Sequence, residues 1–170
     1  MINEILDLSR IEAGRVELNI QPVDVMLLAD ECADALASIV QPGVELQREL
    51  AEVSAIQTDE DRLRQILMNL LGNATKFTTQ GRIALSVRAV DEAVEIAVAD
   101  TGVGIPPEDL PHIFEEFRQV DRVGAEAHGT GLGLTIVMKT VELLGGEIRA
   151  ESTVDMGTTF TIKIGSYSPE

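Results

Sequence analysis

Apolar and polar residues recur along the chain with two different periods, which predict a mixture of helices and strands. Apolar spacing of three and four residues predicts helices over 1–13, 24–40 and 131–144, and one that opens at Asp59 and carries 69–78. Alternation predicts strands over 16–20, 44–50, 55–58, 83–90, 94–99, 147–152 and 158–164. Because these elements do not alternate as βαβ units, we expect an α+β fold, a two-layer sandwich in which helices cover a mixed β-sheet.

Four short segments interrupt this pattern with residues suited to binding a nucleotide. They read NLLGNATKFT at 69–78, DTGVGI at 100–105, IFEEFRQVD at 113–121 and GTGLGL at 129–134. The first places amide side chains on a helix, and the second places a carboxylate at the end of a strand. The fourth leads into a helix whose free N–H groups can meet phosphate oxygens. Together these groups supply what a Mg-ATP pocket needs.

The helix that carries 69–78 has a polar edge beside its apolar face. Asn69 and Asn73 are one turn apart, so both amides can reach one site, and Lys76 follows on the same edge. Mg²⁺ prefers oxygen ligands and shares the phosphates, so a single amide oxygen can be its protein ligand. The alternative is a pair of solvated asparagines, but asparagine is a poor helix former. We therefore favour a functional role for this edge.

Asp100 lies at the end of a strand, on the side of its apolar residues Val94, Ile96 and Val98. A buried carboxylate needs a hydrogen-bond donor, because burial without one is costly. That donor can belong to a ligand, or to the backbone of Gly102 or Val103 in an Asp-Thr-Gly turn. Gly102 and Gly104 also allow the backbone to approach a ring, and Ile105 supplies apolar cover.

The glycines at 129, 131 and 133 are spaced G-x-G-x-G and no βαβ unit surrounds them, which excludes a dinucleotide fingerprint. The stretch between Phe117 and Gly129 has no clear period and predicts a flexible lid. Phe114 and Phe117 are one turn apart, and we expect them to anchor the first end of this lid.

In order and spacing, the four segments resemble the N box, first glycine box, F box and second glycine box of the sensor histidine kinase catalytic domain. The resemblance covers nearly the whole chain and implies the Bergerat ATP-binding fold, with ATP and Mg²⁺ as cofactors. It makes Asn73 the Mg²⁺ ligand and places Asn69 and Lys76 at the reacting phosphates. It also implies that Asp100 accepts a hydrogen bond from the exocyclic amino group of adenine. The other nucleotide contacts that it implies are Gly102, Gly104, Ile105, Gly129, Thr130, Gly131, Leu132, Gly133 and Thr158.

The first residues, INEILDLSRIEAGRVEL, resemble the end of the second helix of a histidine kinase dimerisation hairpin. The resemblance divides the chain into this helix end at 1–13, the ATP-binding catalytic domain at 14–166 and a tail at 167–170. An ordinary amphipathic helix lying on its own domain is the alternative for 1–13. The partners implied are the dimerisation and histidine phosphotransfer domain of the same kinase, through which the parent protein is a homodimer, and a response regulator receiver domain.

Two departures from the family pattern concern the lid and the acceptor. Glu126, Ala127 and His128 stand where the family often has a basic residue and a Gly-Gly pair, which leaves Arg118 and Arg122 as candidates for the γ-phosphate. The family's acceptor is a histidine followed by an acidic residue on the first dimerisation helix. The two histidines of this chain, at 112 and 128, lack that context, so we expect both to be structural or lid residues.

The bulk composition narrows the possible partners and location. The 170 residues are 45% hydrophobic, enough for one core, and the formal charge of −16 opposes binding to nucleic acid or an anionic membrane. The single cysteine, Cys32, predicts a core or half-buried thiol in a reducing compartment. No apolar run approaches the ~20 residues of a membrane span. We expect a cytoplasmic domain, whether or not its parent is membrane-anchored.

The predicted function is transfer of the γ-phosphate of ATP to a histidine on the dimerisation domain, a reaction catalysed mainly by positioning and charge neutralisation. One alternative is an ATPase module of the same superfamily, which usually has an acidic residue where this chain has Asn69. Another is a nucleotide-binding regulatory module without transfer activity. On the first hypothesis, the isolated chain binds ATP but does not label itself.

Overall fold

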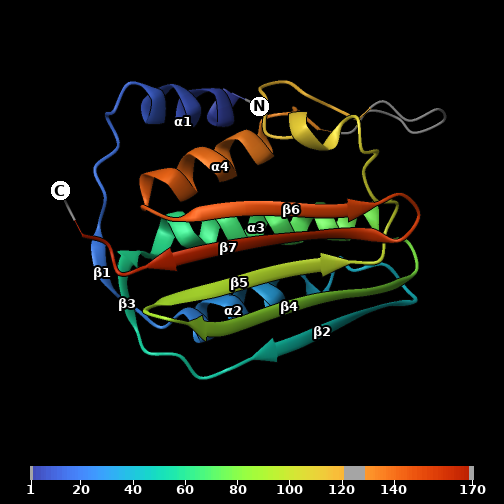
Figure 1. Ribbon diagram of the computed structural model, residues 1–170, viewed down its shortest axis with the longest axis horizontal. Coiled ribbons are helices and arrows are strands. Elements are labelled where there is room, and N and C mark those ends of the chain that lie inside the picture. Colours follow the sequence, from blue (N-terminus) through green and yellow to red (C-terminus); the bar gives the residue numbers. More distant parts are fainter. Residues whose placement is uncertain (1, 121–128, 169–170) are drawn as a thin grey trace.

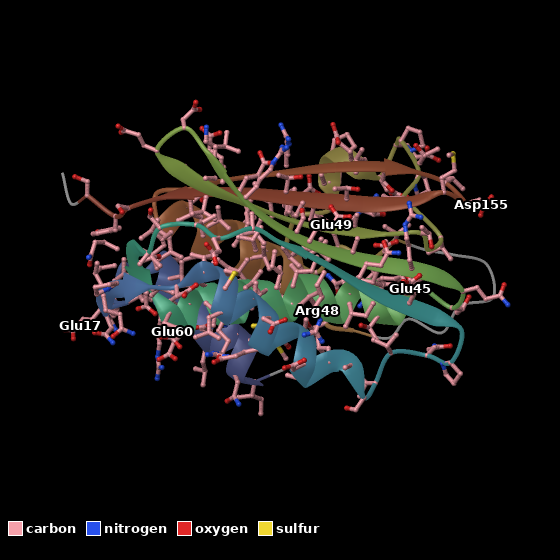
Figure 2. The ribbon with its side chains drawn as sticks, turned by 90° about the horizontal axis from the view of Figure 1, so that it is seen from below. Glu17, Glu45, Arg48, Glu49, Glu60 and Asp155 are labelled. Carbon is pink, nitrogen blue, oxygen red and sulfur yellow. The ribbon has the colours of Figure 1, made fainter. Side chains whose placement is uncertain are left out.

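The chain folds into a β-sheet with helices packed on one of its faces (Figures 1 and 2). The computed structural model describes residues 2–120 and 129–168. The sheet has five strands in the order β2 (Val44–Leu50), β4 (Gly81–Val90), β5 (Ala93–Asp100), β7 (Gly157–Gly165) and β6 (Glu147–Thr153). The covering helices are α2 (Val25–Ala37), α3 (Glu60–Phe77) and α4 (Gly133–Leu143). The predicted α+β sandwich with a mixed sheet is therefore confirmed.

The sheet is mixed because β2 pairs with β4 in parallel, while its other pairs are antiparallel. The turn between β4 and β5 lies at Asp91-Glu92, as the alternating pattern predicts, and Asp91 takes a positive φ of 56°. The pairing of β5 with β7 ends with Asp100 opposite Thr158. Residues that are far apart in the sequence thereby meet at one end of the sheet.

A separate two-stranded sheet joins β1 (Ile20–Val23) to β3 (Ile56–Asp59). The predicted strand at 16–20 is wrong in position, because the strand begins at Ile20 and runs through Pro22. Proline donates no hydrogen bond, but it is tolerated in a strand that has an unpaired edge. On the other side of β3, the backbone of Gln57 pairs with Tyr167 N–H at 2.7 Å.

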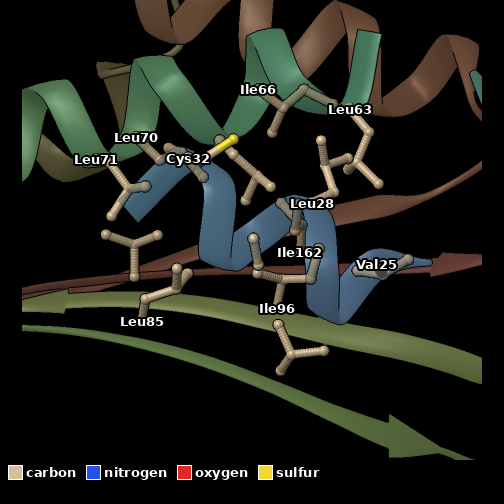
Figure 3. Packing of buried hydrophobic residues seen from close by; sticks show 14 of the residues in the cluster. Val25, Leu28, Cys32, Leu63, Ile66, Leu70, Leu71, Leu85, Ile96 and Ile162 are labelled. Atoms are coloured by element: carbon tan, nitrogen blue, oxygen red, sulfur yellow. The ribbon is translucent and has the colours of Figure 1, made fainter. Parts of the chain in front are cut away.

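The main core lies between the sheet and the helices (Figure 3). Strand residues at alternate positions point into it, and α3 packs there through the predicted apolar arc of Leu63, Ile66, Leu67, Leu70 and Ala74. Cys32 of α2 is fully buried against this layer, and burial raises the pKa of its thiol. The predicted core thiol is confirmed.

Two helices begin at an aspartate, as predicted from the sequence. The Asp24 carboxylate accepts a hydrogen bond from Leu27 N–H at 3.0 Å, and Asp59 accepts one from Arg62 N–H at 3.0 Å. Asp59 also accepts from Asn19 N–H at 2.8 Å, which ties the segment before β1 to the start of α3. The bonds from Leu27 and Arg62 satisfy donors that a helix start leaves without an intrahelical partner.

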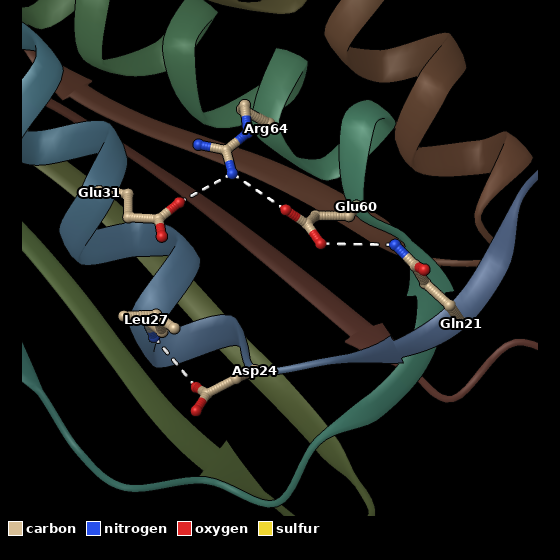
Figure 4. A network of polar contacts seen from close by, with 6 residues as sticks. All are labelled: Gln21, Asp24, Leu27, Glu31, Glu60 and Arg64. Atoms are coloured by element: carbon tan, nitrogen blue, oxygen red, sulfur yellow. Dashed lines mark hydrogen bonds and ion pairs between the residues drawn. The ribbon is translucent and has the colours of Figure 1, made fainter.

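The outer surfaces of α2 and α3 are joined by polar contacts (Figure 4). Arg64 of α3 contacts Glu31 of α2 at 2.8 Å and Glu60 of its own helix at 3.0 Å. Glu60 also accepts a hydrogen bond from Gln21 at 3.4 Å. Exposed ion pairs contribute little to stability, so we expect this network to add little to the free energy of folding.

The first helix, α1 (Ile2–Glu12), lies outside the main core and packs along α4 (Figure 1). Its Leu8 is buried with Leu132 and Ile136 in a second, smaller apolar cluster. Ile2, at 75% exposed, and the neighbouring Ile5 and Leu6 face outward. Across residues 2–120 and 129–168, no helix combines the length and the apolar character that crossing a membrane requires.

Candidate functional site

The predicted site residues gather at the end of the sheet where β5 and α3 finish and α4 begins (Figure 1). The 129–133 segment lies against the polar edge of α3. A Cβ atom built on Gly133 would be 3.5 Å from Asn69 Oδ1, and one on Gly129 would be 3.1 Å from Lys76 Nζ. Residues more than fifty positions apart in the sequence thus lie side by side, as a shared site would require.

The residues on the polar edge of α3 differ in solvent exposure. Asn69 and Asn73 are half-buried beside the apolar face, while Lys76 is exposed at the last turn. The Lys76 ammonium lies 5.1 Å from the centre of the Phe77 ring, a cation–π contact that orients it. The edge therefore offers two amides and one cation to whatever lies between α3 and the 129–133 segment.

Asp100 ends β5 half-buried, and two backbone groups surround its carboxylate. Gly102 N–H donates to Asp100 Oδ1 at 2.9 Å, so the turn predicted as an alternative is present. Burial raises the pKa of Asp100, although hydrogen bonds from the backbone of Gly102 and Thr158 lower it in part. A carboxylate has about four lone-pair positions, so these two bonds leave capacity for a ligand's donor.

The glycines of the 100–105 loop are required by contacts within the chain. A Cβ on Gly102 would lie 2.3 Å from the Phe77 carbonyl oxygen, and one on Gly104 would lie 2.1 Å from that of Thr153. Gly104 also has a φ of +68°, which side chains other than glycine rarely adopt. The loop is thereby held between the end of α3 and the turn after β6. This close packing against neighbouring backbone accounts for both glycines without a ligand.

Ser152 supports the same loop, although it belongs to none of the four sequence segments. Its hydroxyl accepts a hydrogen bond from Ile105 N–H at 2.7 Å and lies 2.8 Å from Thr158 Oγ1. Ser152 pairs with Thr158 across β6 and β7. A correct alignment of these two strands in the sequence could have revealed it, since the strands bracket a short turn at 154–156.

The 129–133 segment makes a tight turn before α4. Gly131 has a φ of +72°, and a Cβ there would be 2.7 Å from the carbonyl carbon of Phe117. Thr130 Oγ1 accepts a hydrogen bond from Leu132 N–H at 3.2 Å, and the Leu132 side chain is fully buried. Within the described part of the chain, no side chain caps the start of α4. Leu132, the residue before α4, therefore offers the first N–H groups of the helix no side-chain acceptor.

The two phenylalanines of the segment at 113–120 differ in how their side chains pack. Phe114 packs edge-on against Phe160, with ring centres 6.3 Å apart, and Phe160 is buried in the core. Phe117 is 64% exposed, so its side chain does not anchor a lid. Its backbone makes the contact instead, because it takes a positive φ of 58° and approaches Gly131.

Several predicted lid residues lie outside the described residues, namely Arg122, Glu126, Ala127 and His128. Of the remaining candidates, Arg118 forms an ion pair with Asp109 at 2.7 Å. His112 is the last residue of η1 (Leu110–His112), and its ring Nδ1 lies 2.6 Å from Glu115 Oε1. The Arg118 guanidinium is thus held toward Asp109 through one of its nitrogens.

The donor set matches a lightly held, hard cation better than a protein-caged metal. Across 2–120 and 129–168 there is no group of three or more His, Cys, Asp or Glu side chains that could hold a metal ion. The amides of Asn69 and Asn73 fit Mg²⁺, which keeps several waters and completes its shell with substrate phosphates.

Comparison with known proteins places this geometry among histidine kinases. The family model described as histidine kinase-, DNA gyrase B-, and HSP90-like ATPase matches residues 58–167. The chain is 42% identical to the circadian input-output histidine kinase CikA of Synechococcus elongatus over 96% of its own length. It is 39% identical to the signal transduction histidine-protein kinase BarA of Escherichia coli K12 over the same share. It spans only 22% and 19% of these two proteins.

Solved structures agree with the sequence comparison. Full-length ShkA in complex with AMPPNP superposes with a TM-score of 0.88 at 34% identity, covering 99% of this chain and 35% of that one. The histidine kinase AdeS of Acinetobacter baumannii gives a TM-score of 0.80 at 25% identity, covering 98% of this chain and 77% of that one. The fold of this chain is therefore shared with these proteins.

Proposed function

This chain belongs to the histidine kinase-, DNA gyrase B- and HSP90-like ATPase family, and from that premise we propose that it is the catalytic domain of a sensor histidine kinase. It binds Mg-ATP and donates the γ-phosphate to a histidine on a dimerisation domain of its parent protein. The observation that carries this proposal is the close approach of the 129–133 segment to the amide edge of α3, with Asn69 Oδ1 3.5 Å from a Cβ built on Gly133.

At the phosphate end, the proposed roles follow from the burial and the charge of the side chains on α3. Asn73 supplies an amide oxygen to Mg²⁺, and Asn69 orients a phosphate oxygen or a water on the same edge. Lys76 neutralises phosphate charge from the exposed last turn of α3. When bound, Mg²⁺ offsets the negative charge that develops on the transferred group.

The start of α4 completes the phosphate end. Free N–H groups at a helix start favour anions, and the small residues before it let the backbone approach them. We assign this contact to the segment Gly129, Thr130, Gly131, Leu132 and Gly133. Leu132 contributes through its backbone, because its side chain is fully buried.

At the base end, Asp100 accepts the exocyclic amino group of adenine. Guanine carries a carbonyl there, which a carboxylate would repel, so the role implies a preference for ATP over GTP. Thr158 supports Asp100 from the paired strand, and Ile105 covers the base. Gly102 and Gly104 hold the loop that brings these groups together.

The parent protein extends these proposals beyond the chain. We assign 1–13 to the end of the second dimerisation helix, 14–166 to the catalytic domain and 167–170 to a tail. The partners are then the dimerisation and phosphotransfer domain, through which the parent forms a homodimer, and a response regulator receiver domain. The domain would act in the cytoplasm.

Labelled ATP tests the transfer reaction. The chain is mixed with a separately produced dimerisation hairpin from a histidine kinase, and Asn73→Ala serves as the inactive comparison. We expect acid-labile, alkali-stable label on the hairpin and little on the chain itself. Transfer is expected to be slow, because docking replaces a covalent link and its high effective concentration. Release of free phosphate without labelled hairpin, or stable label on His112, would contradict the proposal.

A further inference from the structure

The helix α1 is attached to the rest of the molecule at intervals along its length. Near its start, Glu4 Oε1 accepts a hydrogen bond from Thr130 Oγ1 at 3.2 Å. In its middle, Asp7 contacts α3 and Leu8 enters the small apolar cluster with Leu132 and Ile136. At its end, Glu12 lies 3.7 Å from Lys139 of α4. Two of these contacts reach the 129–133 segment.

The middle attachment is the strongest of the polar contacts. The Asp7 carboxylate is only 18% exposed and accepts hydrogen bonds from Arg62 at 2.9 Å and Gln65 at 2.6 Å. Burial would raise the pKa of Asp7, but these bonds and the charges of Arg62 and Arg10 keep it below its ordinary value. Charge-assisted bonds of this kind are about twice as strong as neutral ones. Asp7 thus fixes α1 one helical turn away from Asn69, because Gln65 and Asn69 are neighbours on α3.

The contacts to the 129–133 segment fix its shape as well as its place. Thr130 links Glu4 to Leu132 N–H, since its hydroxyl donates to the first and accepts from the second. Leu132 is held from the other side by Leu8, in a cluster that is separate from the main core. The turn that leads into α4 is thereby clamped between α1 and the polar edge of α3.

From this arrangement we propose that α1 is a positioning element for the phosphate end of the nucleotide site, acting through Glu4 on Thr130 and through Leu8 on Leu132. The inference rests on the proposed function, in which Thr130 and Leu132 belong to the phosphate-binding turn. Docking of α1 and binding of nucleotide phosphates then strengthen each other, because coupling between two sites is reciprocal. The base end, at Asp100 and Thr158, is out of reach of this effect.

Calorimetric titrations with two ligands test the proposal. AMP-PNP with Mg²⁺ uses both ends of the site, whereas adenosine uses only the base end. We expect Glu4→Ala to weaken AMP-PNP binding roughly threefold to tenfold, the net worth of one hydrogen bond, and to leave adenosine binding unchanged. Leu8→Ala should act in the same direction. Glu12→Ala is the matched control, because it removes the contact of α1 to Lys139 and spares the 129–133 segment.

Hydrogen exchange gives an independent readout. Mg-AMP-PNP should slow exchange of the α1 amides in the unmodified chain, and adenosine should not. Two results would overturn the positioning role. One is equal AMP-PNP affinity in Glu4→Ala, Leu8→Ala and the unmodified chain. The other is an exchange rate of the α1 amides that is the same with and without Mg-AMP-PNP. Failure of the unmodified chain to bind AMP-PNP would instead refute the proposed function. Alanine is the best helix former and Leu8 lies outside the main core, so both variants should fold.

Discussion

Single residues at the site serve the fold and the proposed chemistry at once, and Asp100 is the clearest case. The phase of its strand places it beside the core, so the sequence predicts a carboxylate in need of a donor. The sequence could not decide between a ligand and a turn, because both use the same short Asp-Thr-Gly string. The structure supplies the turn through Gly102 N–H and leaves acceptor capacity beyond it.

Asp100→Asn should separate these two demands. Burial raises the pKa of Asp100, so between its ordinary and its raised pKa the folded state binds more protons than the unfolded state. The free energy of unfolding of the protein therefore falls as pH rises through that window, because the carboxylate ionises. A neutral amide does not ionise and avoids this loss. We expect an equal or higher free energy of unfolding in urea at pH 7. Titration should show a lost preference for ATP over GTP, because the amide presents N–H donors to the base. Lower stability with unchanged preference would contradict both parts.

Asn73→Ala should weaken Mg-ATP binding without loss of folded structure, since the side chain lies at a half-buried helix edge. Loss of one amide ligand is expected to reduce affinity by about tenfold, close to the worth of a hydrogen bond to a charged group. The matched control is Gly72→Ala on the adjacent position, where a Cβ would meet nothing within 4 Å. Calorimetry should find normal binding in the control, whose helix gains roughly 0.5–1 kcal/mol. Comparable affinity loss in both variants would indicate a disturbed helix, not a lost ligand.

At the scale of elements, local signals predicted helices more faithfully than the first strand. Asp24 and Asp59 mark helix starts because a cap acts within three residues, and the apolar arc of α3 follows from its own spacing. The strand at 16–20 was misplaced because its position is set by pairing with Ile56–Asp59, about forty residues later. Proline at position 22 reads as a stop, yet an edge position accommodates it.

The two helix caps provide a prediction with an internal comparison. Asp59 is 5% exposed and accepts from both Arg62 and Asn19, whereas Asp24 is exposed and caps Leu27. Asp59→Ala should lower the free energy of unfolding by about 2–3 kcal/mol, since it also leaves a donor without a partner. Asp24→Ala should cost about 1 kcal/mol. Urea denaturation measures both, and equal losses would mean that the Asn19 contact adds nothing.

At the scale of the whole molecule, the sequence predicted the layers but not their order. The strand order β2-β4-β5-β7-β6 depends on pairings such as Ala97 with Thr161, which no local pattern reveals. The four segments of the candidate site could be recognised from the sequence because each carries its own chemistry, whereas the roles assigned to their residues stay predictions. The helix contact of Glu4 with Thr130 escaped prediction, since it joins residues 126 positions apart.

Net charge makes the whole molecule sensitive to salt. A formal charge of −16 on 170 residues causes self-repulsion in the compact state, and salt screens it. Salt also weakens exposed pairs such as Arg64–Glu31, but each of those is worth at most about 1 kcal/mol. Repulsion should dominate, so the free energy of unfolding should rise between low and physiological ionic strength. A fall in thermal denaturation temperature over that range would show that the ion pairs outweigh it.

The burial of Cys32 makes its thiol a natural probe of local opening in the core. The chain has one cysteine, its thiol is fully covered where α2 meets α3, and burial raises its pKa. A thiol reagent therefore reacts only when those two helices part, and every labelled molecule records one such opening. The reaction rate therefore reports how often the core opens locally, and no engineered probe is needed. When the rate is measured with and without nucleotide, a difference shows that a ligand at the far end of α3 changes local opening around Cys32.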